Sequence, residues 1–441
     1  MTKLSSRDEA LRIIETFDAL PTKKKVEIFR DLSPEAREEL LEVASRPWEI
    51  VRQISEEEIY FTIKSVGRDK MPALIAMTTG EQLRHLIDMD SWTKDFFDPA
   101  AASQWLKIIT SIGEEKVLQF LETADPELNV MILNGLIRVS VRDPDIDHLE
   151  ELDQFPTFTL DNIFFIEFNG LIPEELVKTF LSAIYKWNPE YYYTLVQQMV
   201  AGVDPRTEEM ALKWRRARLA DKGFPDFDEA LEIYSFVPRE AISLADRESW
   251  QLHSDDDPRT QEVLIYPLVA LNDDNLFKKS LDRVMDPDER QRLLVQLAHL
   301  ANKVMVADVK DPGSIGDLKN SIKKVSGYIN ICLEEIGLAN IEKAIEAVES
   351  NHMEMLFRRG FSLVAELQRL ALKFVKQLPG GVENSGHPLG FIIKGLLQKR
   401  PVFTSVSTDG PKSREFESMS DLKLIKGMIN KKVFEENWEL L

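Results

Sequence analysis

The sequence predicts an all-α fold, or nearly so. Three observations predict it: polar residues that recur directly before proline, apolar residues spaced as on helices, and a scarcity of alternating strand patterns. The chain of 441 residues is 44% hydrophobic and 29% charged. It is therefore long enough to bury a sizeable core, in about three domains or in one extended array.

The pairs of a polar residue and proline mark helix starts. The polar oxygen can accept a hydrogen bond from a free backbone N–H of the first turn, and proline at the first helical position has no N–H to leave unsatisfied. Two capping boxes, Ser55 with Glu58 and Thr79 with Gln82, mark further starts. The pairs are Ser33-Pro34, Asp98-Pro99, Asp125-Pro126, Asn188-Pro189, Asp204-Pro205 and Asp286-Pro287.

Residues 1–141 are expected to form a helical-repeat region. Its helix starts fall irregularly, about 20 to 27 residues apart, which suits short helices stacked into a superhelix better than a strict repeat. Residues 126–139 carry apolar side chains on nearly every face, at helical spacing from Leu128 to Val139. This pattern predicts a helix buried almost all round.

Residues 142–250 are expected to form a mainly helical middle segment, and residues 251–441 a C-terminal helical bundle. The best strand candidate is "FTLDNIFFIEF" (158–168), which predicts one short β-hairpin in the middle of the chain. Residues 401–420 mix Ser, Thr, Gly and Pro with little periodicity, so they are expected to be irregular. The bundle is predicted from two apolar stripes, one of Leu294, Leu297, Ala298 and Ala301, the other of Leu356, Leu363, Val364, Leu367, Leu370 and Phe374.

Charge and cysteine content narrow the classes of function. The net charge is −20, from 75 acidic and 55 basic residues, which disfavours nucleic acid and anionic membranes unless a local basic patch overrides it. The single cysteine excludes an intramolecular disulfide and a multi-cysteine metal site. The N-terminal stretch is charged where a signal peptide needs an apolar core, and no apolar run is long enough to span a membrane. A cytoplasmic location is expected.

The stretch "DPDIDHLEELDQF" (143–155) begins like a calcium-binding loop. Asp143, Asp145 and Asp147 occupy the first three ligand positions of an EF-hand. His148 stands where the sharp turn needs glycine, and Gln154 cannot supply the bidentate carboxylate at position 12. The pattern therefore indicates an acidic connection between helices, and weak divalent-cation binding stays open.

Two other polar stretches indicate turns. In "LHSDDDPRT" (252–260), Asp257 before Pro258 is typical of a helix N-cap, although the aspartates 255–257 leave a weak divalent-cation site open. In "GVENSGHP" (381–388), Gly381 and Gly386 have the spacing of a P-loop. His387 and Pro388 replace its lysine and hydroxyl residue, so we expect a turn.

The sequence singles out no catalytic, cofactor-binding or metal-ligating residue. The six histidines show no H-E-x-x-H pair and no ligand spacing, and no G-x-S-x-G elbow is present. Cys332 lies on an apolar stripe with Val325 and Ile329, which is typical of a small core residue rather than a nucleophile.

Two stretches are candidates for contact with a partner. In "LKWRRARLADKGF" (212–224), Trp214, Arg215 and Arg218 either receive an acidic partner or pair with internal carboxylates, and the acidic composition favours internal pairing. In "YKWNPEYYYTL" (185–195), three consecutive tyrosines spread over about 200° of a helix and cannot all face one core. We therefore keep Tyr191 and Tyr192 as interface candidates.

Four N-terminal stretches resemble a known family: "LSPEAREELLEVA", "ISEEEIYFTIKSVG", "TTGEQLRHLIDM" and "GEEKVLQFLETADPELNVMIL". They are similar to the helical repeats in the cytoplasmic N domain of MgtE-type magnesium transporters and to the related helical domain of the flagellar protein FliG. The chain has no transmembrane helices and no recognisable nucleotide-sensing module, so transport is not implied and no magnesium residue can be carried over.

Most of the chain also resembles an uncharacterised bacterial family of unknown function. The stretches that carry this resemblance are "WRRARLADKGFPDFDEALEIYSFVP" (214–238) and "GFIIKGLLQKRPVF" (390–403). It implies no known activity.

We expect a non-enzymatic cytoplasmic scaffold or adaptor whose concave helical surface binds a protein partner, because helical arrays offer long grooves. Two alternatives stay open. A regulator that responds to a small molecule or a divalent cation predicts stabilisation by its ligand. An enzyme of unrecognised class predicts a pocket with convergent polar groups and perturbed carboxylates.

Overall fold

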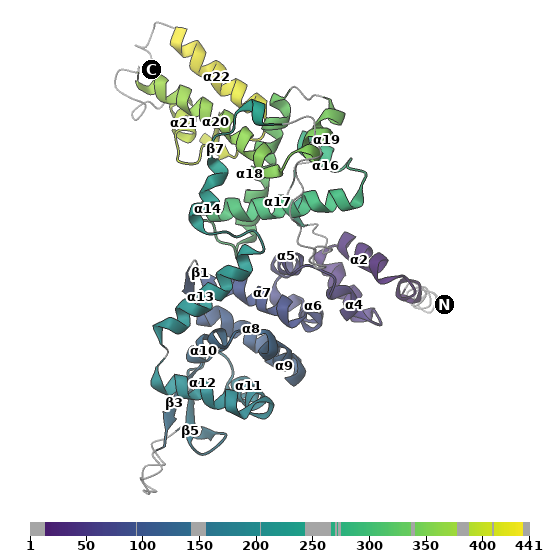
Figure 1. Ribbon diagram of the computed structural model, residues 1–441, viewed down its shortest axis with the longest axis vertical. Helices are drawn as coiled ribbons and strands as arrows, with labels where there is room; N and C mark the ends of the chain where they lie inside the picture. Colours follow the sequence, from purple (N-terminus) through teal and green to yellow (C-terminus); the bar gives the residue numbers. More distant parts are fainter. Residues whose placement is uncertain are drawn as a thin grey trace. The chain divides into compact units, whose positions relative to one another are not determined.

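The computed structural model describes residues 14–93, 95–142, 156–202, 204–242, 266–269, 271, 275–336, 340–376, 388–407 and 410–434. The predicted acidic connections 143–155 and 252–260 and the predicted turn 381–387 lie outside these residues. The chain forms two compact units, Met1–Arg218 and Leu219–Leu441, whereas the sequence suggested boundaries after residues 141 and 250. Both units are mainly helical, as predicted (Figure 1).

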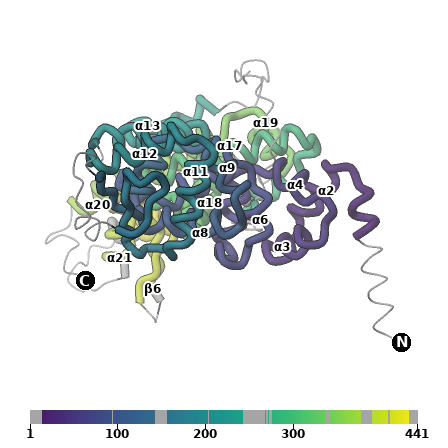
Figure 2. Tube along the Cα trace, turned by 90° about the horizontal axis from the view of Figure 1, so that it is seen from below, coloured from purple at the N-terminus to yellow at the C-terminus, as the bar shows by residue number. Residues whose placement is uncertain are grey.

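The N-terminal unit is an array of short helices in which each helix packs mainly against the next one or two. For example, α7 contacts α5, α8 and α9, and α11 contacts α8, α9 and α12. Figure 2 shows the helices of this unit following one another from α2 to α12. They are α2 (Thr22–Asp31), α3 (Pro34–Val43), α4 (Pro47–Val51), α5 (Glu56–Val66), α6 (Pro72–Met77), α7 (Gly80–Asp90), α8 (Pro99–Ile112), α9 (Glu114–Thr123), α10 (Pro126–Asn134), α11 (Glu174–Trp187), α12 (Pro189–Ala201) and α13 (Pro205–Ala220).

Side-chain caps mark about half of these helix starts. Ser33 and Asn188 accept hydrogen bonds from backbone N–H groups of α3 and α12, and Thr79 with Gln82 forms the complete capping box of α7. Asp125 precedes Pro126 but makes no side-chain cap. Its carboxylate instead pairs with an arginine on α13, so a residue that reads as a cap from local sequence serves a tertiary contact.

The predicted helix through Val139 is wrong beyond residue 134. Helix α10 ends at Asn134, and Ile137–Val141 forms strand β3. Ile137, Val139 and Val141 alternate at period two, which the helical interpretation overlooked. The predicted middle hairpin is confirmed as β4 (Phe158–Thr159) and β5 (Phe164–Phe168), and β3 extends it to a three-stranded antiparallel sheet in the order β3-β5-β4.

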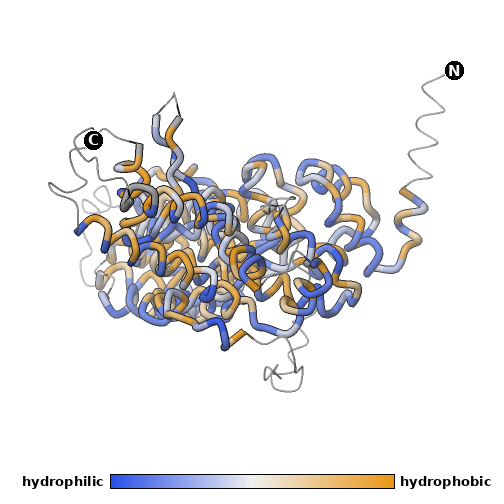
Figure 3. The backbone as a smooth tube through the Cα atoms, turned by 90° about the horizontal axis from the view of Figure 1, so that it is seen from above, coloured by the Kyte–Doolittle hydropathy of each residue, from blue (hydrophilic) through white to orange (hydrophobic). Residues whose placement is uncertain are grey.

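The C-terminal unit is a helical bundle with three long helices, α17, α18 and α20, at its centre. Their predicted apolar stripes are buried, including Leu297, Leu356 and Val364. Figure 3 shows hydrophobic and hydrophilic stretches alternating along the helices, as burial of one side requires. The helices are α14 (Phe227–Leu231), α15 (Tyr266–Val269), α16 (Leu276–Leu281), α17 (Pro287–Ala307), α18 (Ile315–Glu335), α19 (Ile341–Ser350), α20 (Met353–Lys376), α21 (Pro388–Leu396) and α22 (Met419–Phe434).

Helix α18 is approached closely on two sides. A Cβ atom on Gly360 of α20 would lie 1.9 Å from the Tyr328 carbonyl oxygen, so glycine lets α20 reach the backbone of α18. A Cβ atom on Gly327 would lie 2.1 Å from the Phe416 carbonyl oxygen. Cys332 is fully buried on the same helix, in keeping with its predicted place in the core.

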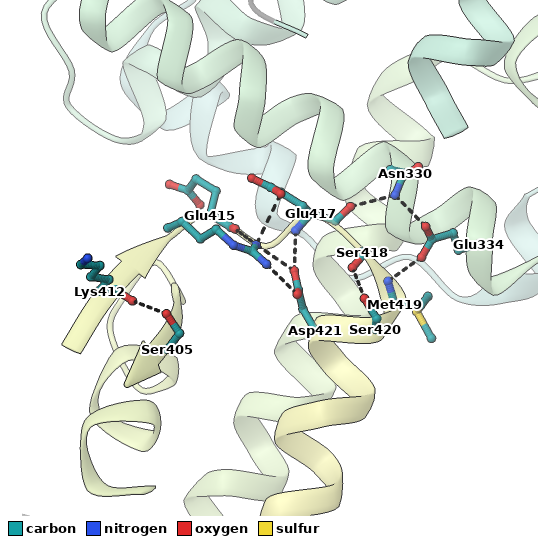
Figure 4. A network of polar contacts seen from close by, with 11 residues as sticks. Asn330, Glu334, Ser405, Lys412, Glu415, Glu417, Ser418, Met419, Ser420 and Asp421 are labelled. Atoms are coloured by element: carbon teal, nitrogen blue, oxygen red, sulfur yellow. Dashed lines mark hydrogen bonds and ion pairs between the residues drawn. The ribbon is translucent and has the colours of Figure 1, made fainter. Parts of the chain in front are cut away.

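Residues 401–420 are more regular than predicted. They contain the hairpin of β6 (Phe403–Ser407) and β7 (Gly410–Arg414), and the extended residues after it lie along α18. Asn330 of α18 donates to the Glu417 carbonyl oxygen at 2.8 Å, and Glu334 accepts from the Met419 N–H at 2.6 Å (Figure 4). These contacts come from a distant helix, so the local sequence pattern does not show them.

Candidate functional site

An open groove lies between α10, α12 and α13 of the N-terminal unit. Its volume is about 320 Å³. The start of α10 supplies Glu127, and α13 supplies Met210 at its apolar end. The lining residues are Pro126, Glu127, Gln198, Asp204, Arg206, Thr207 and Met210. A groove between helices that combines apolar and charged walls is the kind of surface to which a peptide segment binds.

The charged side chains of the groove differ in whether they have an ion-pair partner. Asp204 is bound by Arg206, whose Nε and Nη2 donate to its Oδ2 at 2.9 and 2.7 Å. Among the described residues, the Glu127 carboxylate makes no ion pair. The groove therefore presents one uncompensated negative charge.

Helix α13, which forms one wall, is anchored by two of the arginines that the sequence singled out. Arg218 donates to both carboxylate oxygens of Asp88, at 2.7 and 3.0 Å, and to Asp125 at 2.5 Å. Arg215 donates to the Asp88 carbonyl oxygen at 2.8 Å and lies over the Trp92 ring. Burial lowers the pKa of Arg215 to about 10. Both guanidinium groups therefore bind acceptors within the protein. Arg215 and Arg218 are for this reason no longer candidates for contact with a partner.

Trp214 lies one turn before Arg218 on α13 but, unlike Arg215 and Arg218, it is exposed. Its side chain is 43% exposed. Thr207, Met210 and Trp214 are spaced at i, i+3 and i+7, so they share the face of the helix that lines the groove. Trp214 thus extends the groove with an exposed aromatic ring.

The two tyrosine candidates occupy different environments. Tyr192 is fully buried, 5.2 Å from the Tyr185 ring and 5.6 Å from the Tyr193 ring, measured between centroids. Tyr192 therefore cannot reach a partner and is no longer a candidate for contact with one. Tyr191 is half-buried, and its hydroxyl accepts a hydrogen bond from the Asn129 side chain on α10 at 2.8 Å. Tyr191 thereby joins the two helices that flank the groove.

A short hairpin packs against the middle of α13. It consists of β1 (Trp92–Thr93) and β2 (Phe96–Phe97). Trp92 packs with Met131 of α10 and Ala211 of α13, and Phe97 lies against this cluster. Phe96 points the other way and is 74% exposed. Arg216 of α13 pairs with Asp95 at the hairpin tip at 2.9 Å. This hairpin was not predicted from the sequence, because two-residue strands leave no periodic pattern.

The C-terminal unit holds a second, buried polar cluster around Asp308, the residue directly after α17. Its carboxylate accepts hydrogen bonds from Tyr234 at 2.9 Å, Arg400 at 2.7 Å and Lys324 at 2.6 Å. The Arg400 guanidinium stacks 3.7 Å from the centroid of the Tyr234 ring. Burial would raise the pKa of Asp308, but these donors, led by Lys324, hold it below its usual range.

Two polar atoms beside this cluster have no partner among the described residues. They are the hydroxyl of the fully buried Tyr328 and Oε2 of Glu415. Burial raises the pKa of both groups, although Lys324 lies 3.8 Å from the other oxygen of Glu415. Sequence reasoning missed this cluster, because its members come from five separate segments and form no local motif.

Neither site has the composition of a metal centre. Within the described ranges, no group of three or more His, Cys, Asp or Glu side chains is placed to hold a metal ion. Over the same ranges, no helix has both the length and the apolar character that a membrane crossing needs.

The fold and the groove define a helical-array protein with an open, mixed-polarity groove. The chain belongs to the family described as "Family of unknown function (DUF6178)", which it matches over residues 14–433. No curated protein and no solved structure matches the chain.

Proposed function

We propose that the protein is a scaffold or adaptor that binds a segment of a protein partner in the groove between α10, α12 and α13. The observation that carries this proposal is the exposed Trp214 on α13, one turn beyond Met210, which lines the open groove. A tryptophan next to a groove supplies the large, rigid contact area that is typical of interface hot spots.

The groove favours a partner segment with basic and apolar residues. Glu127 offers an uncompensated carboxylate, and Met210 and Pro126 offer apolar contact. The net charge of −20 would also speed the approach of a basic segment. Arg218 and Asp88 hold α13 in place, so they support the groove without contacting the partner.

A peptide-binding experiment tests the proposal. The probes are two fluorescent amphipathic helical peptides of about 15 residues, one built from Lys and Leu and the other from Glu and Leu. We expect the full-length protein to bind the basic peptide only. Glu127→Lys and Trp214→Ala are each expected to weaken binding about 10-fold or more, as loss of a hot-spot residue does.

Two variants serve as matched controls. Trp48 is 42% exposed, close to the exposure of Trp214, but lies on α4. Glu122 is an exposed carboxylate on α9. Trp48→Ala and Glu122→Lys should bind as the unmodified protein does. The proposal is refuted if they weaken binding as much as the groove variants, since the peptide would then respond to overall charge.

Ligand binding at the Asp308 cluster is a second candidate function. It is favoured by the position of two buried, unpartnered polar atoms, the Tyr328 hydroxyl and Glu415 Oε2, beside the charged groups of this cluster, because buried polar groups normally have a hydrogen-bond partner. A thermal-shift panel of small carboxylates, phosphates and divalent cations tests it. A stabilising compound should lose its effect in Tyr328→Phe, and no stabilisation by any compound would count against this candidate.

The resemblance of the N-terminal helices to the N domain of MgtE-type transporters and to FliG stays a prediction. What supports it is the array of short helices in the N-terminal unit. It agrees with a protein-binding role, and the cytoplasmic location that we expect is part of the same proposal.

A further inference from the structure

The charge of the chain is distributed unevenly along the sequence. Residues 369–434 contain 12 basic and 5 acidic residues, a net charge of +7. The rest of the chain contains 43 basic and 70 acidic residues, a net charge of −27. Such a reversal of sign within an acidic protein is typical of a surface that meets an anionic partner.

Eight of the twelve basic residues of this segment lie on α20, α21 and α22. Helix α20 contacts α21 and α22, and Figure 1 shows these three helices at the same end of the C-terminal unit. Five exposed lysines make no hydrogen bond or ion pair within the described part of the chain. They are Lys373, Lys376, Lys399, Lys423 and Lys426.

Most other charged side chains of this end have partners inside the protein, whereas Arg369 is exposed and makes a cation–π contact with the Phe236 ring. Arg400 binds Asp308, and Arg414 binds Asp421 with two hydrogen bonds of 2.9 and 2.7 Å. Glu366 and Glu417 each lie within ion-pair distance of an arginine. The uncompensated charge is therefore carried mainly by lysines, which act as flexible point charges rather than as bidentate forks.

Apolar side chains stand exposed between these lysines. Leu372 is 45% exposed beside Lys373, and Leu424 is 51% exposed beside Lys423. Phe391 of α21 is 37% exposed. On α20, Leu372, Lys373 and Lys376 follow one another at helical spacing on one exposed stripe. Lysines with interspersed Leu and Phe on a surface are typical of helices that lie on a membrane.

We propose that this face, formed by the second half of α20 together with α21 and α22, binds the surface of an anionic lipid bilayer. The lysines would lie among the headgroups while Leu372, Phe391 and Leu424 enter the boundary of the acyl chains. This surface is separate from the groove of the N-terminal unit, and the proposal does not depend on the function proposed there.

A bilayer fits the observations better than the other anionic partners. Nucleic-acid phosphates would use the lysines but leave the exposed leucines without a role. Two of the three arginines of this segment, Arg400 and Arg414, are bound to carboxylates and are not free to read base edges. The −27 charge of the rest of the chain acts against the bilayer only within about 8 Å, because salt screens it at longer range. An acidic protein is the competing partner that the experiment must separate.

Vesicle co-sedimentation tests the proposal with the full-length protein. The probes are vesicles of phosphatidylcholine alone and vesicles in which about a third of the lipid is phosphatidylserine. We expect binding to the anionic vesicles only, weakened at high salt. Each lysine close to an anionic surface contributes about fivefold in affinity. The triple variant Lys373→Glu, Lys423→Glu, Lys426→Glu should therefore bind at least about 100-fold more weakly.

Matched variants separate the face from the overall charge. Lys23, Lys107 and Lys213 are exposed and unpaired within the described residues but lie in the N-terminal unit. Their triple reversal to Glu should leave vesicle binding within about threefold. Leu372→Asn with Leu424→Asn should weaken binding without changing its salt dependence. The proposal fails if anionic vesicles do not bind, if both triple variants weaken binding equally, or if the leucine variants have no effect.

Discussion

Arg218 holds Asp88 through two hydrogen bonds, of 2.7 and 3.0 Å, that join the last turn of α13 to α7, 130 residues earlier in the chain. The Asp88 side chain is 1% exposed, and its main-chain carbonyl oxygen accepts a further bond from Arg215. The wall of the proposed groove thus depends on a nearly buried ion pair between segments that lie far apart in sequence.

Removing Arg218 is expected to destabilise the protein strongly. Arg218→Ala leaves the Asp88 carboxylate buried without its cation, which costs about 3–5 kcal/mol in the free energy of unfolding. Urea unfolding measures the change. Arg216→Ala is the control, because the Arg216–Asp95 pair is exposed on both sides and contributes below about 1 kcal/mol. Equal effects of the two variants would contradict a structural role for the Arg218–Asp88 pair.

Gly360→Ala is expected to destabilise the C-terminal unit. Its Cβ atom would meet the Tyr328 carbonyl oxygen at 1.9 Å, so α20 would have to move away from α18 at a cost of about 1–3 kcal/mol or more. Gly427→Ala on α22 is the matched control, since nothing lies within 4 Å of its added Cβ. It should be neutral or stabilising by up to about 1 kcal/mol. Thermal unfolding of both variants distinguishes the two outcomes.

Lys116 is expected to make stability depend on pH in the alkaline range. Its ammonium group is bound by neutral acceptors, including the Thr78 carbonyl oxygen at 2.5 Å and the Gln119 side chain at 3.1 Å. Burial lowers the pKa of Lys116 to about 8, whereas lysine in an unfolded chain has a pKa near 10.4. Between about pH 8 and 10.4 the unfolded chain therefore binds more protons than the folded chain, so the free energy of unfolding rises with pH.

Lys116→Met should remove this slope, which is at most about 1.4 kcal/mol per pH unit. The measurement is urea unfolding at intervals from pH 7 to 10, and Lys107→Met, at an exposed position of α8, is the control. Below about pH 8, Lys116 is protonated in both the folded and the unfolded chain, so its contribution to the slope disappears. A slope that is the same in all three proteins would show that Lys116 is not its source.

Asn330→Asp is expected to loosen the segment between β7 and α22. The Asn330 amide nitrogen donates to the Glu334 carboxylate at 2.9 Å and to the Glu417 carbonyl oxygen at 2.8 Å. In Asn330→Asp an oxygen would replace this nitrogen and face two hydrogen-bond acceptors. This should lower the free energy of unfolding by about 2–4 kcal/mol. Hydrogen exchange of the Met419 N–H, which Glu334 binds, should accelerate. Protection at Met419 that matches the unmodified protein would refute this role.

The fold class could be predicted from local sequence because its cause is local. Polar caps before proline and apolar stripes act within one or two turns, so eight helix starts and the central hairpin were recognisable. Residues 137–141 were assigned wrongly because a short strand with Ile and Val also fits a helical spacing. Trp214 was found as a candidate because its stretch combines an aromatic ring with charge, but the groove beside it was not.

The sequence by itself determined where helices begin, which faces are apolar and that the segment 369–434 is basic within an acidic chain. Only the tertiary structure decided that Arg218 meets Asp88, that Tyr192 is buried while Trp214 is exposed, and that Asp308 collects Tyr234, Lys324 and Arg400. The physical reason is the distance along the chain over which each interaction acts. Capping and periodicity act between neighbours along the chain, whereas burial and ion pairing depend on residues that only folding brings together.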